Sequence, residues 1–377
     1  MQRPQTKYSK KYSTEDKTKT RRLLLIIERR RKMKLWGQEY SRESLMKNVG
    51  DISQVCGVRR LVIDDGPGRG MRLFDVRTGG GLTFSVLPDR GMDISYGHYN
   101  DIPIGFISKT GPVSPYLCEH EGFGFLRGFT GGLLTTCGYT YMGAPCIDEG
   151  KPLGLHGRAS TLVSANTSTG ESWDGDDYNI RIDGTMREAV VFGENIQLDR
   201  SICVKAGENR FIIKDTVTNC GFDRHPLMLL YHFNFGHPLV GPQTRLVTSK
   251  NAGVTPRDEI AAGGLDKCYE FQTPTHQYAE QVFYHDLTPD GEGAVFAGLY
   301  NDSLNFGVNI KVNNKELPYI IQWKQMGEGD YTCGIEPATW KPEGRAAARA
   351  SGELQFIEPG EQREFNLEVG IVTQTDI

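Results

Sequence analysis

Two polar side chains stand two residues apart in a strongly apolar stretch, Leu229 to Pro238 (LLYHFNFGHP). They are His232 and Asn234. Side chains of a β-strand alternate between its two faces, so these two would share one face. The residues of the other face are aromatic: Tyr231, Phe233 and Phe235. This pattern predicts a strand that forms the floor of a ligand-binding cleft.

Three further ionisable residues stand in apolar or glycine-rich surroundings: Arg90, His156 and Glu336. A buried ionisable group needs a partner or a ligand. Each one alone also has a structural interpretation, since Arg90 can pair with a neighbouring aspartate and a histidine on a strand is commonly a hydrogen-bonded core residue. Together with His232, they supply the acid and base that proton-transfer chemistry requires.

Other kinds of site are disfavoured by spacing. His232 and His237 lie five residues apart, so on one strand they would point to opposite faces, and the chain has no H-x-H pair. No G-x-S-x-G nucleophile motif and no phosphate-binding glycine loop occurs. We therefore expect neither a metal nor a cofactor.

The charge of the chain is divided unevenly. Residues 1–34 carry a net charge of +10, and the remainder carries −14. We predict that residues 1–34 are a basic, disordered extension, and an acidic body disfavours nucleic acid as a partner. The apolar run Leu23 to Ile27 is too short for a signal peptide or a membrane span. The eight cysteines are scattered and have no C-x-x-C spacing, a pattern that is typical of reduced thiols. We therefore expect a cytoplasmic protein, and the short apolar run gives no reason to expect a membrane partner.

Short alternating apolar segments separated by glycine-rich turns run through the rest of the chain. They predict an all-β fold, a large antiparallel β-sandwich with a few short helices, formed by residues 35–377 as a single domain. One short helix is expected after Ser41. Residues 100–150 and 240–275 have little periodicity and are expected to form loops.

Four short motifs occur in order along the chain: PDRGMDI from Pro88, LGLHGR from Leu153, LLYHFNFGHP from Leu229 and GIEPAT from Gly334. In this ordered set the chain resembles the aldose 1-epimerase, or galactose mutarotase-like, superfamily, and within it an uncharacterised bacterial branch. The resemblance runs from about residue 35 to the end. It implies the large mutarotase-like sandwich.

The resemblance also implies the roles of particular residues. Glu336 would be the catalytic base that takes the proton of the anomeric hydroxyl, and His232 the acid that protonates the ring oxygen. The expected substrate-binding residues are Arg90, His156, Arg158 and Asn234. Arg158 replaces the second glycine of the usual L-H-G-G motif, and His232 and Asn234 are two residues apart instead of four. Phe123, Trp323 or Trp340 could stack on a sugar face.

The implied function is that of an isomerase, an aldose 1-epimerase (mutarotase) that interconverts the α and β anomers of a free monosaccharide through ring opening. On this hypothesis Glu336 and His232 would lie on opposite sides of a sugar-sized space. Two alternatives remain: another epimerase, isomerase or lyase acting on a modified or acidic sugar that Arg158 could recognise, and a non-catalytic carbohydrate-binding domain. The sequence leaves the sugar open, and the oligomeric state open between a monomer and a homodimer.

Overall fold

The structure is a computed structural model that describes residues 32–376 of the chain. The predicted basic extension falls almost entirely on residues 1–31, outside the described residues, so the prediction made for it stays a prediction. The first described strand, β1 (Met33–Leu35), begins inside the segment that was expected to be disordered. Met33 and Leu35 are both buried in the main hydrophobic core.

The larger of the two main sheets has eleven antiparallel strands and includes the segments that contain His232 and Glu336. In spatial order its strands are β20 (Asn251–Pro256), β21 (Gln281–Leu287), β24 (Tyr319–Gly327), β25 (Asp330–Ala338), β18 (Met228–Gly236), β10 (Leu134–Tyr139), β6 (Asp93–Tyr99), β5 (Leu82–Leu87), β4 (Arg72–Arg77) and β3 (Gly57–Val62), with β7 (Ile102–Pro103) beside β6.

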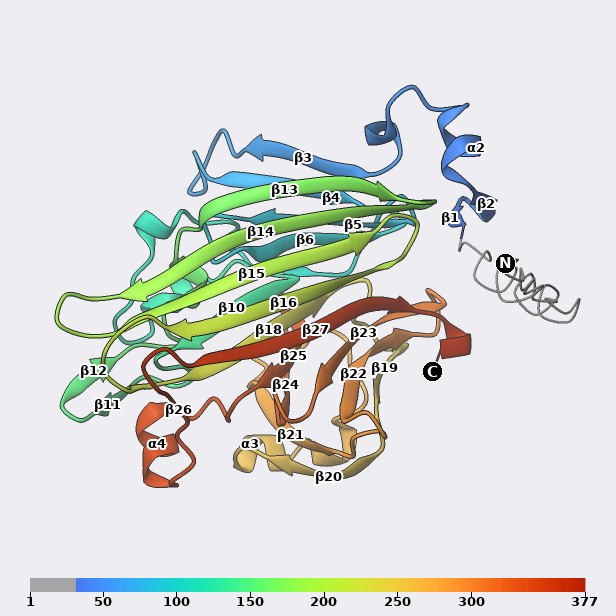
Figure 1. The fold of residues 1–377 in the computed structure, drawn as a ribbon. Helices are drawn as coiled ribbons and strands as arrows, with labels where there is room; N and C mark the ends of the chain where they lie inside the picture. Colours follow the sequence, from blue (N-terminus) through green and yellow to red (C-terminus); the bar gives the residue numbers. More distant parts are fainter. Residues whose placement is uncertain (1–31, 377) are drawn as a thin grey trace, which may run out of the picture.

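A second antiparallel sheet of eight strands packs against the first. Its order is β13 (Ala165–Asp174), β14 (Asp177–Ala189), β15 (Asn195–Lys205), β16 (Arg210–Asn219), β27 (Gln362–Val372), β23 (Phe306–Asn313), β22 (Ala294–Asn301) and β19 (Thr244–Thr248). The long strands β14, β15 and β16 extend across the larger sheet (Figure 1). The predicted β-sandwich is confirmed.

The remaining elements are short. The two-stranded pairs are β1 with β2 (Gln38–Tyr40), β8 (Phe106–Ile107) with β9 (Gly131–Gly132), β11 (Cys146–Asp148) with β12 (Lys151–Leu153), and β17 (His225–Pro226) with β26 (Phe356–Ile357). The α-helices are α2 (Arg42–Met46), α3 (Glu259–Ala262) and α4 (Arg345–Ala350). The 3₁₀ turns are η1 (Ile52–Gln54), η2 (Pro115–Leu117), η3 (Gly124–Arg127), η4 (Ala159–Thr161), η5 (Leu265–Lys267) and η6 (Gln374–Asp376).

The period-two alternation of the sequence accounts for the sandwich. Along β15, buried and half-buried residues alternate over the whole strand, because one face packs on the larger sheet and the other is partly open to solvent. The helix predicted after Ser41 is also confirmed. It is α2, whose first turn is capped by the Ser41 hydroxyl accepting a hydrogen bond from the backbone N–H of Ser44.

Two segments that were predicted to be loops contain strands. Residues 100–150 include β10, which pairs with β18 near the middle of the larger sheet. All six residues of β10 are buried, so its sequence shows no alternation between apolar and polar residues. Residues 240–275 include β19 (TRLVT) and β20 (NAGVTP), which are only five and six residues long. The asparagine, glycine and proline of β20 are also typical of turns.

Candidate active site

Strand β18 separates two different environments, one on each of its faces. Its residues Leu229, Tyr231, Phe233 and Phe235 face the eight-stranded sheet and belong to the main core. The alternate positions, which include His232, face the outer side of the larger sheet. There Met228 and Leu230 belong to a second hydrophobic cluster, which includes Phe125, Phe129 and Met142. The sequence prediction for the two faces of this strand is confirmed.

His232 and Glu336 meet on this outer face. Strand β25 pairs with β18 in a register that sets Phe233 opposite Ile335, so His232 stands directly opposite Glu336. Residues directly opposite each other in an antiparallel pair have neighbouring side chains. Nε2 of His232 lies 3.2 Å from Oε1 of Glu336, and both side chains are at least nine-tenths buried. The two groups are thus neighbours on one wall, and the expectation that they flank a sugar from opposite sides is wrong.

Gly334 makes room for this pair. A Cβ atom at position 334 would lie 2.6 Å from Oε1 of Glu336 and 3.2 Å from Cε1 of His232. A side chain here would therefore displace the carboxyl group. Gly334 is the first residue of the GIEPAT motif, but its packing role depends on His232, which is far away in the sequence, so the sequence alone does not reveal it.

His156 reaches the same place from a loop. It adopts a left-handed backbone conformation with φ of 61°, which costs energy for a residue other than glycine. Its backbone N–H donates to the carbonyl of Gly143, and its carbonyl accepts from Gly138, which fixes the turn. The imidazole ring centre lies 5.8 Å from that of His232.

Burial sets the protonation of all three groups. It raises the pKa of Glu336 to about 8, lowers the pKa of His156 to about 4, and lowers the pKa of His232 well below its ordinary value. At neutral pH the carboxyl group is therefore protonated and both imidazoles are neutral. Nδ1 of His156, Nδ1 of His232 and Oε1 of Glu336 are buried without a hydrogen-bond partner among the described residues. Such atoms are costly unless a ligand completes them.

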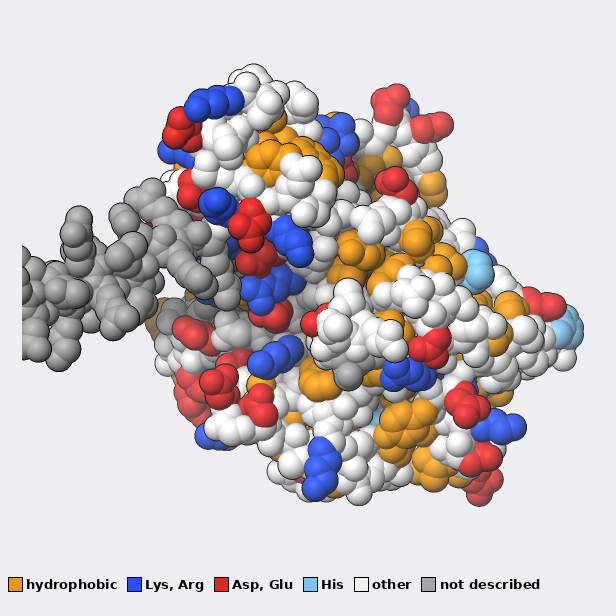
Figure 2. Space-filling view, turned by 90° about the vertical axis from the view of Figure 1, so that its right-hand side faces the viewer, with side chains coloured by type: hydrophobic (Ala, Val, Ile, Leu, Met, Phe, Trp, Pro, Cys, Tyr) orange, Lys and Arg blue, Asp and Glu red, His pale blue; other side chains and the backbone are white. Residues whose placement is uncertain are grey.

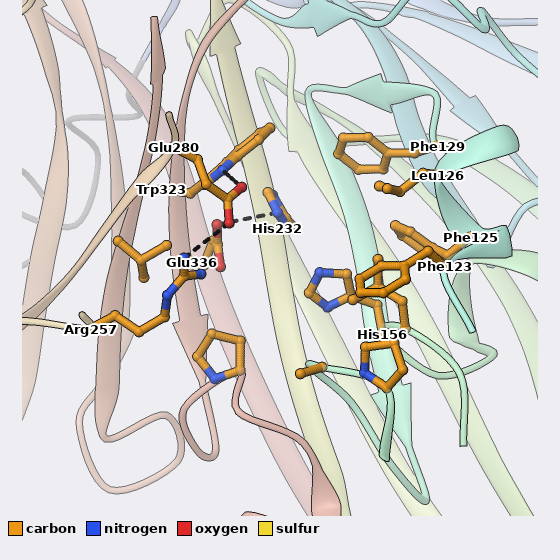
Figure 3. Close-up of a pocket in the computed structure, with 15 residues that line it drawn as sticks. Phe123, Phe125, Leu126, Phe129, His156, His232, Arg257, Glu280, Trp323 and Glu336 are labelled. Carbon is orange, nitrogen blue, oxygen red and sulfur yellow. Dashed lines mark hydrogen bonds and ion pairs between the residues drawn. The ribbon is translucent and has the colours of Figure 1, made fainter. Parts of the chain in front are cut away.

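These three residues line a pocket of about 370 Å³, a size that suits a small ligand. On one side stand Glu336, Trp323, Arg257 and Glu280, and on the other stands an apolar wall (Figure 3). We define the apolar wall by its five residues: Phe123, Phe125, Leu126, Phe129 and Leu155. The other lining residues are Ala144, Pro145, Val282 and Pro342.

Arg257 and Glu280 were missed by the sequence analysis. Glu280 accepts hydrogen bonds from the indole N–H of Trp323 at 2.8 Å and from Arg257 at 3.1 Å. Arg257 also donates to Asp258 at 2.8 Å. Arg257 follows β20, in the segment 240–275 that was predicted to be a loop, where the charged run Arg257 to Glu259 would normally be solvated. Glu280 lies beyond that segment and directly precedes β21. No local pattern marks these two residues as part of a pocket.

The chain was compared with known proteins. A family model described as "Domain of unknown function (DUF4432)" matches residues 68–371, which include the pocket. The chain belongs to the DUF4432 family. No curated protein matches it by sequence.

Solved structures place the DUF4432 domain among the galactose mutarotase-like folds. A Klebsiella pneumoniae protein described as a candidate aldose 1-epimerase is 25% identical with a TM-score of 0.80, covering 84% of this chain and 83% of that one. A galactose mutarotase-like protein from Clostridium acetobutylicum is 15% identical with a TM-score of 0.57, covering 85% and 100%. The galactose 1-epimerase of Lactobacillus acidophilus is 13% identical with a TM-score of 0.56, covering 84% and 99%. The resemblance noted from the sequence is confirmed.

Arg90, an expected sugar-binding residue, does not line the pocket of this DUF4432 domain. Its guanidinium group is buried and donates to three backbone carbonyls, those of Ser160, Val113 and Gly128. These bonds hold the loop that carries the apolar wall. Arg90 therefore lies behind the pocket.

Asn234 and Arg158 do not line the pocket either. The Asn234 amide is fully buried and donates to the carbonyls of Gly131 and His232. Arg158 is exposed and lines a separate, polar hollow beside β11 and β12. Of the six site residues expected from sequence, the structure thus brings together Glu336, His232 and His156.

The aromatic residues divide in the same way. Phe123 and Trp323 line the pocket. Trp340 is buried in the cluster beneath it and donates its indole N–H to Glu353.

Among residues 32–376, no group of three or more His, Cys, Asp or Glu side chains is arranged to hold a metal ion. No helix in the described part of the chain is long and apolar enough to cross a membrane.

Proposed function

We propose that the protein is an aldose 1-epimerase that interconverts the anomers of a free monosaccharide by general acid–base catalysis. The observation that carries the proposal is the neighbouring pair of Glu336 and His232, with unpartnered polar atoms, beside a pocket of about 370 Å³. The mutarotase-like fold supports it.

The spacing of the pair suits the reaction. Opening an aldopyranose removes a proton from the anomeric hydroxyl O1 and adds a proton to the ring oxygen O5. Both oxygens are bonded to C1, so an acid and a base that serve them need to lie close together. Glu336 and His232, 3.2 Å apart, can each contact one of the two oxygens.

The shifted pKa values suggest which group donates a proton to the sugar and which group accepts one from it. With Glu336 protonated and His232 neutral, Nε2 of His232 accepts the O1 proton while the Glu336 carboxyl group gives its proton to O5. The C1–O5 bond breaks and C1 and O1 form the aldehyde. The pair is then a carboxylate and an imidazolium, and ring closure on the other face of C1 returns both protons. These roles are the reverse of those implied by the resemblance.

His156, Arg257 and Glu280 supply the remaining hydrogen bonds to the sugar in this proposal. The substrate contacts are restricted to residues that line the pocket, which leaves out Arg90, Arg158 and Asn234. Among the described residues lining the pocket, Arg257 is the single Lys or Arg, and two carboxylates already pair with it. Nothing in the pocket favours the alternative of an acidic sugar.

Anomer-exchange NMR tests the proposal. A panel of aldoses is followed by exchange between the two anomeric signals, with the rate in buffer subtracted. The expected result is accelerated exchange for at least one neutral aldose, lost in Glu336→Gln. If the purified wild-type protein accelerates none of the panel, the epimerase assignment is wrong.

A further inference from the structure

The pocket is polar on one side and apolar on the other. Four of the hydrogen-bonding side chains lie on the floor and on the β20–β24 side: Glu336, His232, Arg257 and Glu280 (Figure 3). The fifth, His156, stands beside Phe123 and Phe125 at one end of the apolar wall, with its ring centre 5.1 Å from that of Phe125. The apolar wall facing them has no side chain that can form a hydrogen bond. Two backbone carbonyls of that wall are also engaged: the carbonyl of Phe125 accepts a hydrogen bond from Gly128, and the carbonyl of Phe129 accepts from Ser108 and Thr110.

This division limits what a bound sugar can present to each side. The proposed reaction requires C1 to lie at Glu336 and His232. One edge of the ring then faces Arg257 and Glu280, and another edge faces the apolar wall. Phe129 stands close to the reacting pair, since its ring centre lies 5.5 Å from that of His232. A substituent on the second edge therefore meets carbon atoms.

A hydroxyl group held against the buried Phe125 and Phe129 would lose its hydrogen bonds to water and gain none from those two side chains, whereas the exposed Phe123 and Leu126 leave their part of the wall open to water. Burying a hydroxyl without a partner is unfavourable, whereas a hydrogen atom or a methyl group at the same position gains apolar contact. A pocket of this kind discriminates against an added hydroxyl by up to about 100-fold. The polar side, by contrast, can satisfy O1, O5 and several further hydroxyls.

The charges of the pocket define a second property of the substrate. Arg257 is paired with both Asp258 and Glu280, so the cluster beside the protonated Glu336 carries more negative than positive charge. An anionic sugar would meet repulsion here, because the single cation among the described lining residues, Arg257, is already paired.

We propose that the preferred substrate is a neutral deoxyaldose, whose hydrogen or methyl group in place of a hydroxyl packs on the apolar wall. This inference rests on the epimerase function proposed above and specifies its substrate class. It does not depend on whether the missing hydroxyl is at C2 or C6, because either position can form the edge that faces the wall.

Matched sugars test the inference. D-Galactose is compared with 2-deoxy-D-galactose, 6-deoxy-D-galactose and D-galacturonate, and D-glucose and D-mannose with their deoxy and uronate counterparts. Exchange NMR gives kcat/KM above the buffer rate, and saturation-transfer NMR gives binding independently of catalysis. We expect one deoxy series to exceed its parent aldoses by roughly 10- to 100-fold in kcat/KM, with the uronates poorest.

One substitution changes the wall itself. Leu126 lines the pocket but is half-exposed, so Leu126→Gln adds a hydrogen-bonding group with little risk to folding. We expect it to reduce the preference for the deoxy sugar several-fold. Leu117→Gln is the matched control, because Leu117 lies on the same long segment, is similarly exposed and does not line the pocket. It should leave the preference unchanged.

The two readouts separate failure of the inference from failure of the proposed function. Parent aldoses that exchange as fast as both deoxy series would overturn the substrate class and leave the epimerase intact. Preferential binding of deoxy sugars without accelerated exchange would overturn the epimerase and support the substrate class. If no sugar binds and none is exchanged, both are wrong.

Discussion

The two faces of β18 carry two buried clusters of ionisable groups, and these clusters are built differently. Tyr231 points toward the eight-stranded sheet, where its hydroxyl donates to Asp215 at 2.7 Å. Asp215 also accepts two hydrogen bonds from the fully buried Arg200, at 2.9 and 2.6 Å. One residue further along β18, His232 points to the opposite face and meets Glu336.

The clusters differ in whether their polar atoms are satisfied. Arg200 donates to Asp215, to Thr136 and to backbone carbonyls at Gly91 and Met92. A fully paired network of this kind fixes one arrangement of the core. The pocket cluster instead has three buried atoms without partners and lies against an opening. Unpaired buried polar atoms lower stability and are typical of sites that bind a ligand.

The largest expected effect is the loss of catalysis in Glu336→Gln. Glutamine keeps the shape of the neutral carboxyl group but cannot give up a proton, so the exchange rate should fall by about 10²–10⁴-fold. The circular dichroism spectrum should remain that of the wild type, which shows that the fold is retained. Near-normal exchange in this variant would remove Glu336 from the mechanism.

The opposite face should respond in stability instead. Arg200→Met leaves Asp215 buried without its cationic partner, with only the Tyr231 hydroxyl still donating to it. Breaking a buried ion pair costs about 3–5 kcal/mol of unfolding free energy. Denaturant unfolding measures this loss, while the exchange rate per folded molecule should be retained. A variant as stable as the wild type would show that the cluster does not hold the two sheets together.

Gly334→Ala should disturb the pocket pair without touching the core. The new Cβ would lie 2.6 Å from Oε1 of Glu336, and the flexible carboxyl group can move away. A displacement of about 1 Å can reduce the exchange rate by up to about 100-fold, with little change in unfolding temperature. Gly241→Ala is the matched control, because a Cβ there meets nothing within 4 Å. Equal activity of the two variants would contradict the role of Gly334.

The smallest expected effect, counted per pH unit, is a dependence of the unfolding free energy on pH. Glu336 has a pKa of about 8 in the folded protein and an ordinary value of 4.5. The folded state therefore holds this proton more tightly than the unfolded state. Its contribution to stability is complete below about pH 4.5 and is lost as the pH rises through about 8, at up to about 1.4 kcal/mol per pH unit.

Denaturant titrations at a series of pH values between 4.5 and 8 measure this slope, and Glu336→Gln should remove the part that Glu336 contributes. Burial also raises the pKa of Asp93 to about 6 and that of Glu188 to about 7, and the slopes due to these two groups should remain in the variant. A slope that is unchanged in the variant would mean that the carboxyl group is ionised in the folded protein. The same measurement would then support the roles implied by the resemblance, with Glu336 as the base.

Prediction from sequence succeeded where the signal is local. The alternation around His232 identified β18 and its two faces. The motif LGLHGR identified His156 as a candidate, and the structure shows that this residue has a left-handed backbone conformation. Prediction failed where neighbours decide the role. Arg90 has the same chemistry as a sugar-binding arginine, but three carbonyls from other segments accept its donors. Arg257 resembles a solvated residue until β20 and β21 bring it to the pocket.

The sequence by itself determined the sandwich, the two faces of β18 and the residue types available for proton transfer, because these depend on period-two alternation and on side-chain chemistry. The tertiary structure alone decided that His232 and Glu336, 104 positions apart, touch. Strand register is fixed by long-range pairing, and a shift of one residue would send Glu336 to the opposite face. Burial raises the pKa of Glu336 and lowers that of His232, so the proton lies on the carboxyl group at neutral pH. No local sequence pattern could reveal this, because burial depends on the tertiary structure.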